Sequence, residues 1–172
     1  MVKIVQNGDP VLREKAKLVD LNEIGSPKIK KIIGRMKIAV DSQDDGVAIA
    51  APQIGESLQI FIVSGKAYDF IKNIQGSKDE IFINPKVIKI SKDKQTTDEG
   101  CLSVRWLYGK TRRSSRITVE ALDENGKKKT VGASGLLSHI LQHEYDHLQG
   151  VLFIDHAKEL QDLPPERQVE LG

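Results

Sequence analysis

The chain has 172 residues, of which 39% are hydrophobic and 29% charged, and its net charge is +2 at pH 7. This composition is typical of a globular protein, and the small net charge gives no reason to expect DNA or an anionic membrane as a partner. The single cysteine excludes an internal disulfide and favours a reducing compartment, and no apolar run reaches the ~18 residues of a membrane span. We therefore expect a single cytoplasmic domain over residues 1–172.

The residue pattern of the N-terminal part of the chain predicts a short helical turn and a longer helix. Asp9 is placed to cap a short helical turn, and Ser26-Pro27 has the pattern of an N-cap followed by proline at the first helical position. Apolar residues then recur at three- and four-residue spacing, with lysines between them, up to about Ser42. This periodicity predicts an amphipathic N-terminal helix.

The middle of the chain predicts strands. Apolar or alternating runs occupy residues 46–49, 59–63, 81–84, 87–90, 116–122 and 128–132. Pro85 separates two of these runs, so we expect that strand to be broken or at a sheet edge. Asn125-Gly126 joins the last two runs and is a strong hairpin signal. We expect the polar stretch 64–80 to be a surface excursion with about one helical turn, and the basic runs 112–113 and 127–129 to be solvated.

A second long helix is predicted for residues 135–149, ending at Gly150. After it we expect a short strand or a packed turn at residues 151–153, and a short C-terminal helix from Asp155 to about Leu160. Strands in the middle and helices at both ends favour an α+β fold. In this fold, mixed or antiparallel sheets would pack around the second long helix.

That central helix contains the pattern His-Glu-x-x-His, which places His143 and His147 on one face, where they can share a metal ion. Glu144 lies beside that face, within reach of the reaction centre. A three-histidine site of the metzincin type is excluded, because Phe153 stands where the third histidine would be. Cys101 is the better third ligand. One thiolate and two imidazoles leave a tetrahedral position open, as in catalytic sites, and favour zinc or ferrous iron.

Three stretches of the chain resemble the signature motifs of peptide deformylase. They are residues 46–55, 99–103 and 142–148, and they occur in the family's order with similar intervals. Residues 6–13 and 135–137 are also similar to the family. The resemblance covers nearly the whole chain, and it implies removal of the formyl group from the N-terminal formyl-methionine of new polypeptides, with release of formate.

The resemblance also implies a role for individual residues. Cys101, His143 and His147 would hold one divalent metal ion, Fe²⁺ in the cell, with Zn²⁺, Ni²⁺ or Co²⁺ in purified protein. Glu144 would be the general base and then the general acid. The side chain of Gln53 and the backbone N–H of Leu102 would polarise the formyl oxygen. The carboxylate of Glu99 would support the site from behind the metal ligands.

Residues Gly46, Val47 and Ala48 would pair with the substrate peptide as an added strand. Val47, Leu136 and His139 are candidates for the wall of the methionine pocket. We expect N-formyl-methionyl nascent peptides as partners, a transient ribosome contact, and a monomer.

Departures from the family pattern affect this part of the site. Ala48 stands where the family usually has glycine, His139 where it has an apolar residue, and Arg105-Trp106 where proline commonly follows the valine. Trp106 and Tyr108 are open to two interpretations, an aromatic rim for the peptide or packing on the sheet.

Two other functions stay open. A His-Glu-x-x-His metallopeptidase would take its third ligand from a later helix, where Glu159 and Glu166 are the candidates. A non-catalytic peptide-binding or structural metal domain would be expected to lack Glu144 or to add a fourth protein ligand.

Overall fold

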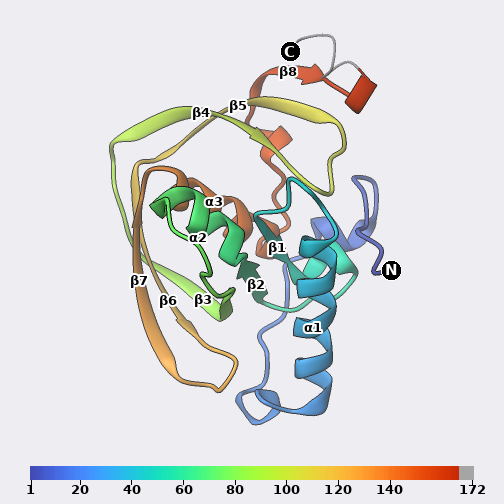
Figure 1. Ribbon diagram of the computed structural model, residues 1–172, viewed down its shortest axis with the longest axis vertical. Helices are drawn as coiled ribbons and strands as arrows, with labels where there is room; N and C mark the ends of the chain where they lie inside the picture. The colour runs from blue at the N-terminus through green and yellow to red at the C-terminus, as the bar shows by residue number, and fades with distance from the viewer. Residues whose placement is uncertain (167–172) are drawn as a thin grey trace.

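A computed structural model describes residues 1–166 of the chain (Figure 1). It contains three α-helices, α1 (Pro27–Asp41), α2 (Gly65–Lys72) and α3 (Gly135–Leu148). The strands are β1 (Ala48–Ala50), β2 (Ile60–Val63), β3 (Glu80–Ile90), β4 (Lys94–Gly100), β5 (Leu107–Ser114), β6 (Arg116–Leu122), β7 (Lys128–Ser134) and β8 (Lys158–Asp162). They form a five-stranded sheet in the order β1-β2-β3-β6-β7 and a three-stranded sheet in the order β4-β5-β8. Neighbouring strands in both sheets are antiparallel, so the predicted α+β class is confirmed.

Helices α1 and α3 pack on opposite faces of the five-stranded sheet, and β2 shows why. Ile60 and Ile62 belong to the apolar cluster that includes the buried face of α1, whereas Phe61 and Val63 belong to the cluster that includes Leu141 of α3. Successive side chains of a strand point to opposite faces, so a strand covered on both sides is apolar throughout. The continuous apolar run at residues 60–63 therefore reflects burial on two sides.

Helix α1 starts where the sequence predicts. The Ser26 side chain accepts a hydrogen bond from the backbone N–H of Ile29 at 3.3 Å, and Pro27 occupies the first turn. Asp9 likewise caps the short 3₁₀ helix Pro10–Arg13 by accepting from the N–H of Val11 at 3.1 Å.

Helix α3 contacts strands of both sheets, including β1, β6 and β7 of the larger one and β5 of the smaller one (Figure 1). Gln142 makes one of these connections. Its amide oxygen accepts from the N–H of Ser114 at 3.1 Å, and its amide N–H donates to the Ser114 carbonyl at 2.8 Å. This backbone-like pairing fixes α3 against the end of β5.

Pro85 does not mark a sheet edge. Strand β3 continues through it, lies between β2 and β6, and has a register shift between Ile83 and Lys86. The expected interruption is therefore a bulge inside the sheet, which accommodates the missing proline N–H. The segment predicted as a surface excursion contains α2, which is longer than the single turn expected there.

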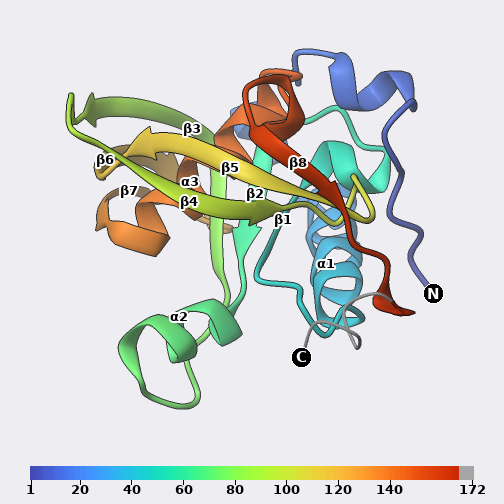
Figure 2. The ribbon, with the colours of Figure 1, turned by 90° about the horizontal axis from the view of Figure 1, so that it is seen from above.

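The predicted short C-terminal helix is wrong, whereas one alternative for the residues before it is confirmed. Of the two alternatives for residues 151–153, the structure has the packed turn, because Leu152 and Phe153 are buried and a 3₁₀ helix occupies Phe153–Asp155. In place of the short helix at residues 155–160, strand β8 pairs with β5, with Leu107 opposite Asp162 (Figure 2). All five residues of β8 are exposed, so their charged pattern resembles that of a solvated helix. Among residues 1–166, no helix combines the length and the apolar character needed to cross a membrane.

Candidate active site

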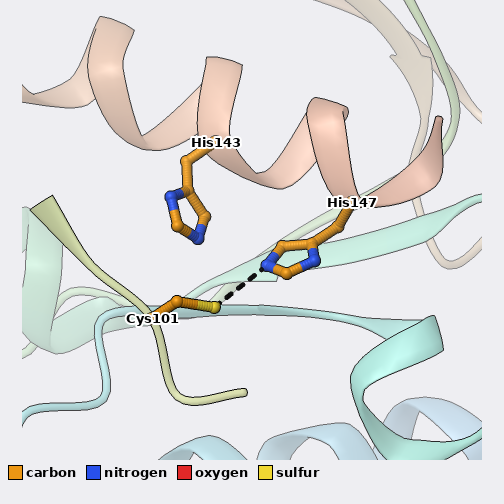
Figure 3. A group of neighbouring side chains, drawn as sticks. All are labelled: Cys101, His143 and His147. Atoms are coloured by element: carbon orange, nitrogen blue, oxygen red, sulfur yellow. Dashed lines mark hydrogen bonds between the residues drawn. The ribbon is translucent and has the colours of Figure 1, made fainter. Parts of the chain in front are cut away.

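Three side chains that can bind metal converge between the two sheets. His143 and His147 lie one turn apart on α3, and Cys101 directly follows β4. Figure 3 shows both imidazoles directed from the helix toward the Cys101 side chain. The Sγ atom of Cys101 is 3.3 Å from Nε2 of His147, and the three ligand atoms all lie within 4.8 Å of one another. One sulfur and two nitrogens at this separation fit a tetrahedral metal ion with one position left open.

Glu99 holds His143 from behind. The Glu99 carboxylate is hydrogen bonded to Nδ1 of His143, which leaves Nε2 as the nitrogen that can bind a metal. Thr111 donates a hydrogen bond to the same carboxylate, and Arg113 donates two, of 2.7 and 2.8 Å. Burial would raise the pKa of Glu99, but the hydrogen bonds from Arg113 and His143 hold this pKa well below its usual value. A charged carboxylate behind a histidine ligand is the arrangement normally found at metal sites, so the donor set fits a metal ion.

Arg113 joins this network to the helix. Its side chain is only 5% exposed, and it donates to Glu99 of β4 and to Asp146 of α3, the latter at 2.9 Å. The expectation that both residues of the basic run 112–113 are solvated is therefore wrong for Arg113, although Arg112 is exposed. The signal that could have found Arg113 is the register of the β4–β5 hairpin. Gln95 pairs with Arg113 and Thr97 with Thr111, so Glu99, Thr111 and Arg113 share one face.

Gln53 reaches the site on the side of Cys101 and Ser103. It lies in the 3₁₀ helix Ala51–Ile54 and is 1% exposed. Its amide oxygen accepts from the N–H of Ala50 at 2.9 Å, which orients the amide nitrogen toward the site. That nitrogen donates to Oγ of Ser103 at 3.1 Å and lies 3.7 Å from Sγ of Cys101. The neighbouring Leu102 is held by its carbonyl, which accepts from the Gln6 side chain at 2.9 Å.

Glu144 is buried in α3, with 4% of the residue exposed. Its Oε2 atom is buried and has no hydrogen-bond partner in the described part of the chain. Burial raises the pKa of Glu144 to about 7. A carboxyl group of this kind can both accept and return a proton near neutral pH.

A cavity of about 280 Å³ opens beside these groups. Its walls contain the proposed ligands Cys101 and His143, together with Gln53, Leu102, Glu99 and Glu144. Four of the five predicted substrate residues also line it, namely Val47, Ala48, Leu136 and His139. Val47 and Leu136 are about half exposed, at 44% and 46%, whereas His139 is buried at 5%.

Gly46, the fifth predicted substrate residue, is not part of the cavity wall. A Cβ atom at this position would lie 2.3 Å from the carbonyl oxygen of Val40, so the close approach of the chain to the end of α1 requires glycine. The next residues lead into β1, which is the edge strand of the five-stranded sheet.

Arg105 and Trp106, which depart from the family pattern, lie beside the cavity, where Arg105 binds the side chain of the cavity residue Asp45. Arg105 makes two hydrogen bonds to the Asp45 carboxylate, of 2.6 and 2.9 Å, and one of 3.0 Å to Gln43. The Arg105 guanidinium also lies 4.4 Å from the centre of the Trp106 ring. Trp106 thus stacks on its neighbour, while Tyr108 lines the cavity.

The fold and this site together describe a small α+β protein in which two helix histidines and a strand-end thiol face a buried carboxyl group. Residues 1–162 match the family model for polypeptide deformylase. The chain is 38% identical to peptide deformylase 1 of Clostridium perfringens, over 87% of this chain and 93% of that protein. It is 40% identical to the peptide deformylase of Pseudothermotoga lettingae, over 89% and 81%. The chain therefore belongs to the polypeptide deformylase family, whose members are enzymes that remove N-terminal formyl groups from nascent polypeptides.

Solved structures give the same result. The peptide deformylase of Thermotoga maritima matches with a TM-score of 0.80 and 34% identity, covering 92% of this chain and 98% of that one. The Synechococcus elongatus enzyme in complex with actinonin matches with a TM-score of 0.79 and 32% identity, covering 92% and 79%.

Proposed function

We propose that this chain hydrolyses the formyl amide of N-formyl-methionyl peptides at the site formed by Cys101, His143, His147 and Glu144. The observation that carries the proposal is the convergence of three metal-binding atoms within 4.8 Å beside Glu144, whose buried Oε2 atom has no hydrogen-bond partner among residues 1–166. A related structure of the Acinetobacter baumannii peptide deformylase is described with Met-Ala-Ser bound, which supports the same product class here.

Glu144 carries the proton in the proposed reaction. A water molecule adds to the formyl carbon, Glu144 takes a proton from that water, and it then gives the proton to the departing amine nitrogen. The bond between the formyl carbon and nitrogen breaks, so the products are formate and a free N-terminal amine. A divalent ion held by Cys101, His143 and His147 would supply Lewis acidity and would lower the pKa of a water molecule toward neutrality.

Gln53 and Leu102 are proposed to stabilise the negative charge on the formyl oxygen. The Gln53 amide is suited to this because Ala50 fixes its oxygen, so that its N–H groups face the site. The backbone N–H of Leu102 follows the proposed ligand Cys101 directly in the chain. A donor placed in advance at such a position typically contributes ~3 kcal/mol to transition-state stabilisation.

Residues 46–48 are proposed to bind the substrate backbone. Strand β1 pairs with β2 on one side only and is the sheet edge, so an extended peptide can add to its other side. Backbone pairing of this kind reads little sequence, which suits an enzyme that acts on many polypeptides. Val47, Leu136 and His139 would then contact the first side chain.

We propose Fe²⁺ as the ion in the cell, with Zn²⁺, Ni²⁺ or Co²⁺ able to replace it in purified protein. The mixed thiolate and imidazole donor set supports an ion of intermediate character. We further propose one catalytic domain over residues 1–172 that acts as a cytoplasmic monomer and contacts the ribosome transiently. The matched family model, which covers residues 1–162, supports the single domain.

The test compares formyl-Met-Ala-Ser with unformylated Met-Ala-Ser, using metal-loaded protein. We expect formate and Met-Ala-Ser from the first peptide and no cleavage of the second. Cleavage of a peptide bond in the unformylated peptide would instead support a metallopeptidase. Tight metal binding with no reaction of either peptide would support a non-catalytic metal domain.

A further inference from the structure

His139 is a buried imidazole to which the reaction assigns no proton transfer. It lies on α3 one turn before His143 and is 5% exposed. Neither of its ring nitrogens has a hydrogen-bond partner among residues 1–166. Buried polar side chains are nearly always paired, so an imidazole with two unpaired nitrogens in a cavity wall points to a ligand.

The surroundings of His139 define the shape of that ligand. His139 lines the main cavity and also a second cavity of about 380 Å³, whose wall includes Thr96 and Thr97 of β4. Leu136 lines both cavities as well, so an apolar chain that enters between Val47 and Leu136 would meet the imidazole. Val47 and Leu136 therefore give the imidazole an apolar side, and Thr96 and Thr97 give it a polar side that opens to the surface at the exposed Thr96.

The charge of His139 limits which ligand atoms it can bind. Burial lowers the pKa of this imidazole, and the two charged groups that act on it, Glu99 and Arg113, have opposite effects and are paired with each other. The neutral ring has one N–H donor and one acceptor nitrogen. A thioether sulfur is only a weak hydrogen-bond acceptor. An ordinary methionine side chain would therefore displace water from the ring and form only a weak hydrogen bond with it.

Building on the proposed function, we propose that the first-residue pocket of this enzyme prefers N-formyl-methionine sulfoxide peptides, with His139 donating a hydrogen bond to the sulfoxide oxygen. Oxidation of methionine places a strong acceptor at the position of the sulfur without changing the length of the side chain. Methionine sulfoxide is therefore a polar side chain that forms from methionine itself by oxidation. Leaving the buried donor unpaired typically weakens binding by roughly 5- to 150-fold, which sets the scale of the preference.

The test measures kcat/KM for formyl-methionine-sulfoxide-Ala-Ser and for formyl-Met-Ala-Ser. Wild-type protein is compared with His139→Leu, which removes both nitrogens, and with His139→Gln, which keeps one donor and one acceptor at similar size. We expect the wild type to prefer the sulfoxide about tenfold, His139→Leu to reverse this preference, and His139→Gln to retain most of it. A sulfoxide-to-thioether ratio that changes less than twofold between wild type and His139→Leu would overturn the inference.

Binding provides a readout that does not depend on turnover. Calorimetry on metal-loaded Glu144→Gln protein, with and without His139→Leu, gives the Kd of each formylated peptide. Tighter binding of the sulfoxide peptide that disappears with His139→Leu supports the inference even if the wild-type protein releases no formate, a result that would contradict only the proposed function. Release of formate with equal Kd values for both peptides would contradict only the inference about His139.

Discussion

Replacing Arg113 by methionine should destabilise the protein strongly and weaken the metal site at the same time. Arg113 is 5% exposed and pairs with Glu99 and Asp146, whose side chains are 11% and 27% exposed. Without it, the buried Glu99 carboxylate loses two of its hydrogen bonds and its main positive neighbour. Breaking a buried pair in this way typically costs ~3–5 kcal/mol, because one charge remains without compensation.

The matched control is Arg112→Met, one residue earlier on the same strand. Arg112 is exposed, so its replacement should change the free energy of unfolding by less than ~0.5 kcal/mol. Urea unfolding of the metal-free proteins compares the two variants without a contribution from metal binding. Because Arg113 also holds the carboxylate behind His143, metal affinity of Arg113→Met should fall by roughly 10- to 100-fold. Equal stability of the two variants would refute the role assigned to the Glu99–Arg113 pair.

Three further predictions concern the site and its rim. Glu144→Gln should retain its metal, measured by elemental analysis, and lose roughly 10²–10⁴-fold in kcat, because the proton carrier is removed; a near-normal rate would contradict its role. Cys101→Ala should lose the metal after dialysis, and full occupancy would require another third ligand. The hydrogen bonds from Arg105 lower the pKa of Asp45, so this pair stabilises the fold above the unfolded pKa of 3.8 and loses its effect as the pH falls through the lower folded value. The difference in unfolding midpoint between wild type and Asp45→Asn should therefore be present at pH 6 and shrink below about pH 4; a constant difference would contradict the assignment.

The parts of the site that could be predicted are those with local spacing. His143 and His147 are four residues apart on one helix, so helix geometry alone brings them together. Coordination chemistry and the family resemblance both predict Cys101 as the third ligand, and the structure brings its sulfur within 3.3 Å of Nε2 of His147. The N-cap of α1 and the β6–β7 hairpin also depend on short-range signals, and both are confirmed.

The parts that could not be predicted depend on contacts between distant segments. Arg113 is buried because β4 and β5 pair in one register and α3 packs above them, and no local pattern distinguishes it from Arg112. The sequence of β8 does not predict a strand because, among residues 1–166, β8 is exposed and pairs with β5 alone, so it needs no alternating apolar pattern. The sheet position of Pro85 likewise depends on the bulge opposite β6.

The most direct test of the account measures the initial rate of formate release from formyl-Met-Ala-Ser against the amount of Fe²⁺ bound per chain, in protein prepared without oxygen. Because Cys101, His143 and His147 form one three-ligand site, the rate should rise in proportion to bound iron and level off at one ion per chain. A rate that is independent of bound metal, or that requires a second ion, would contradict the account.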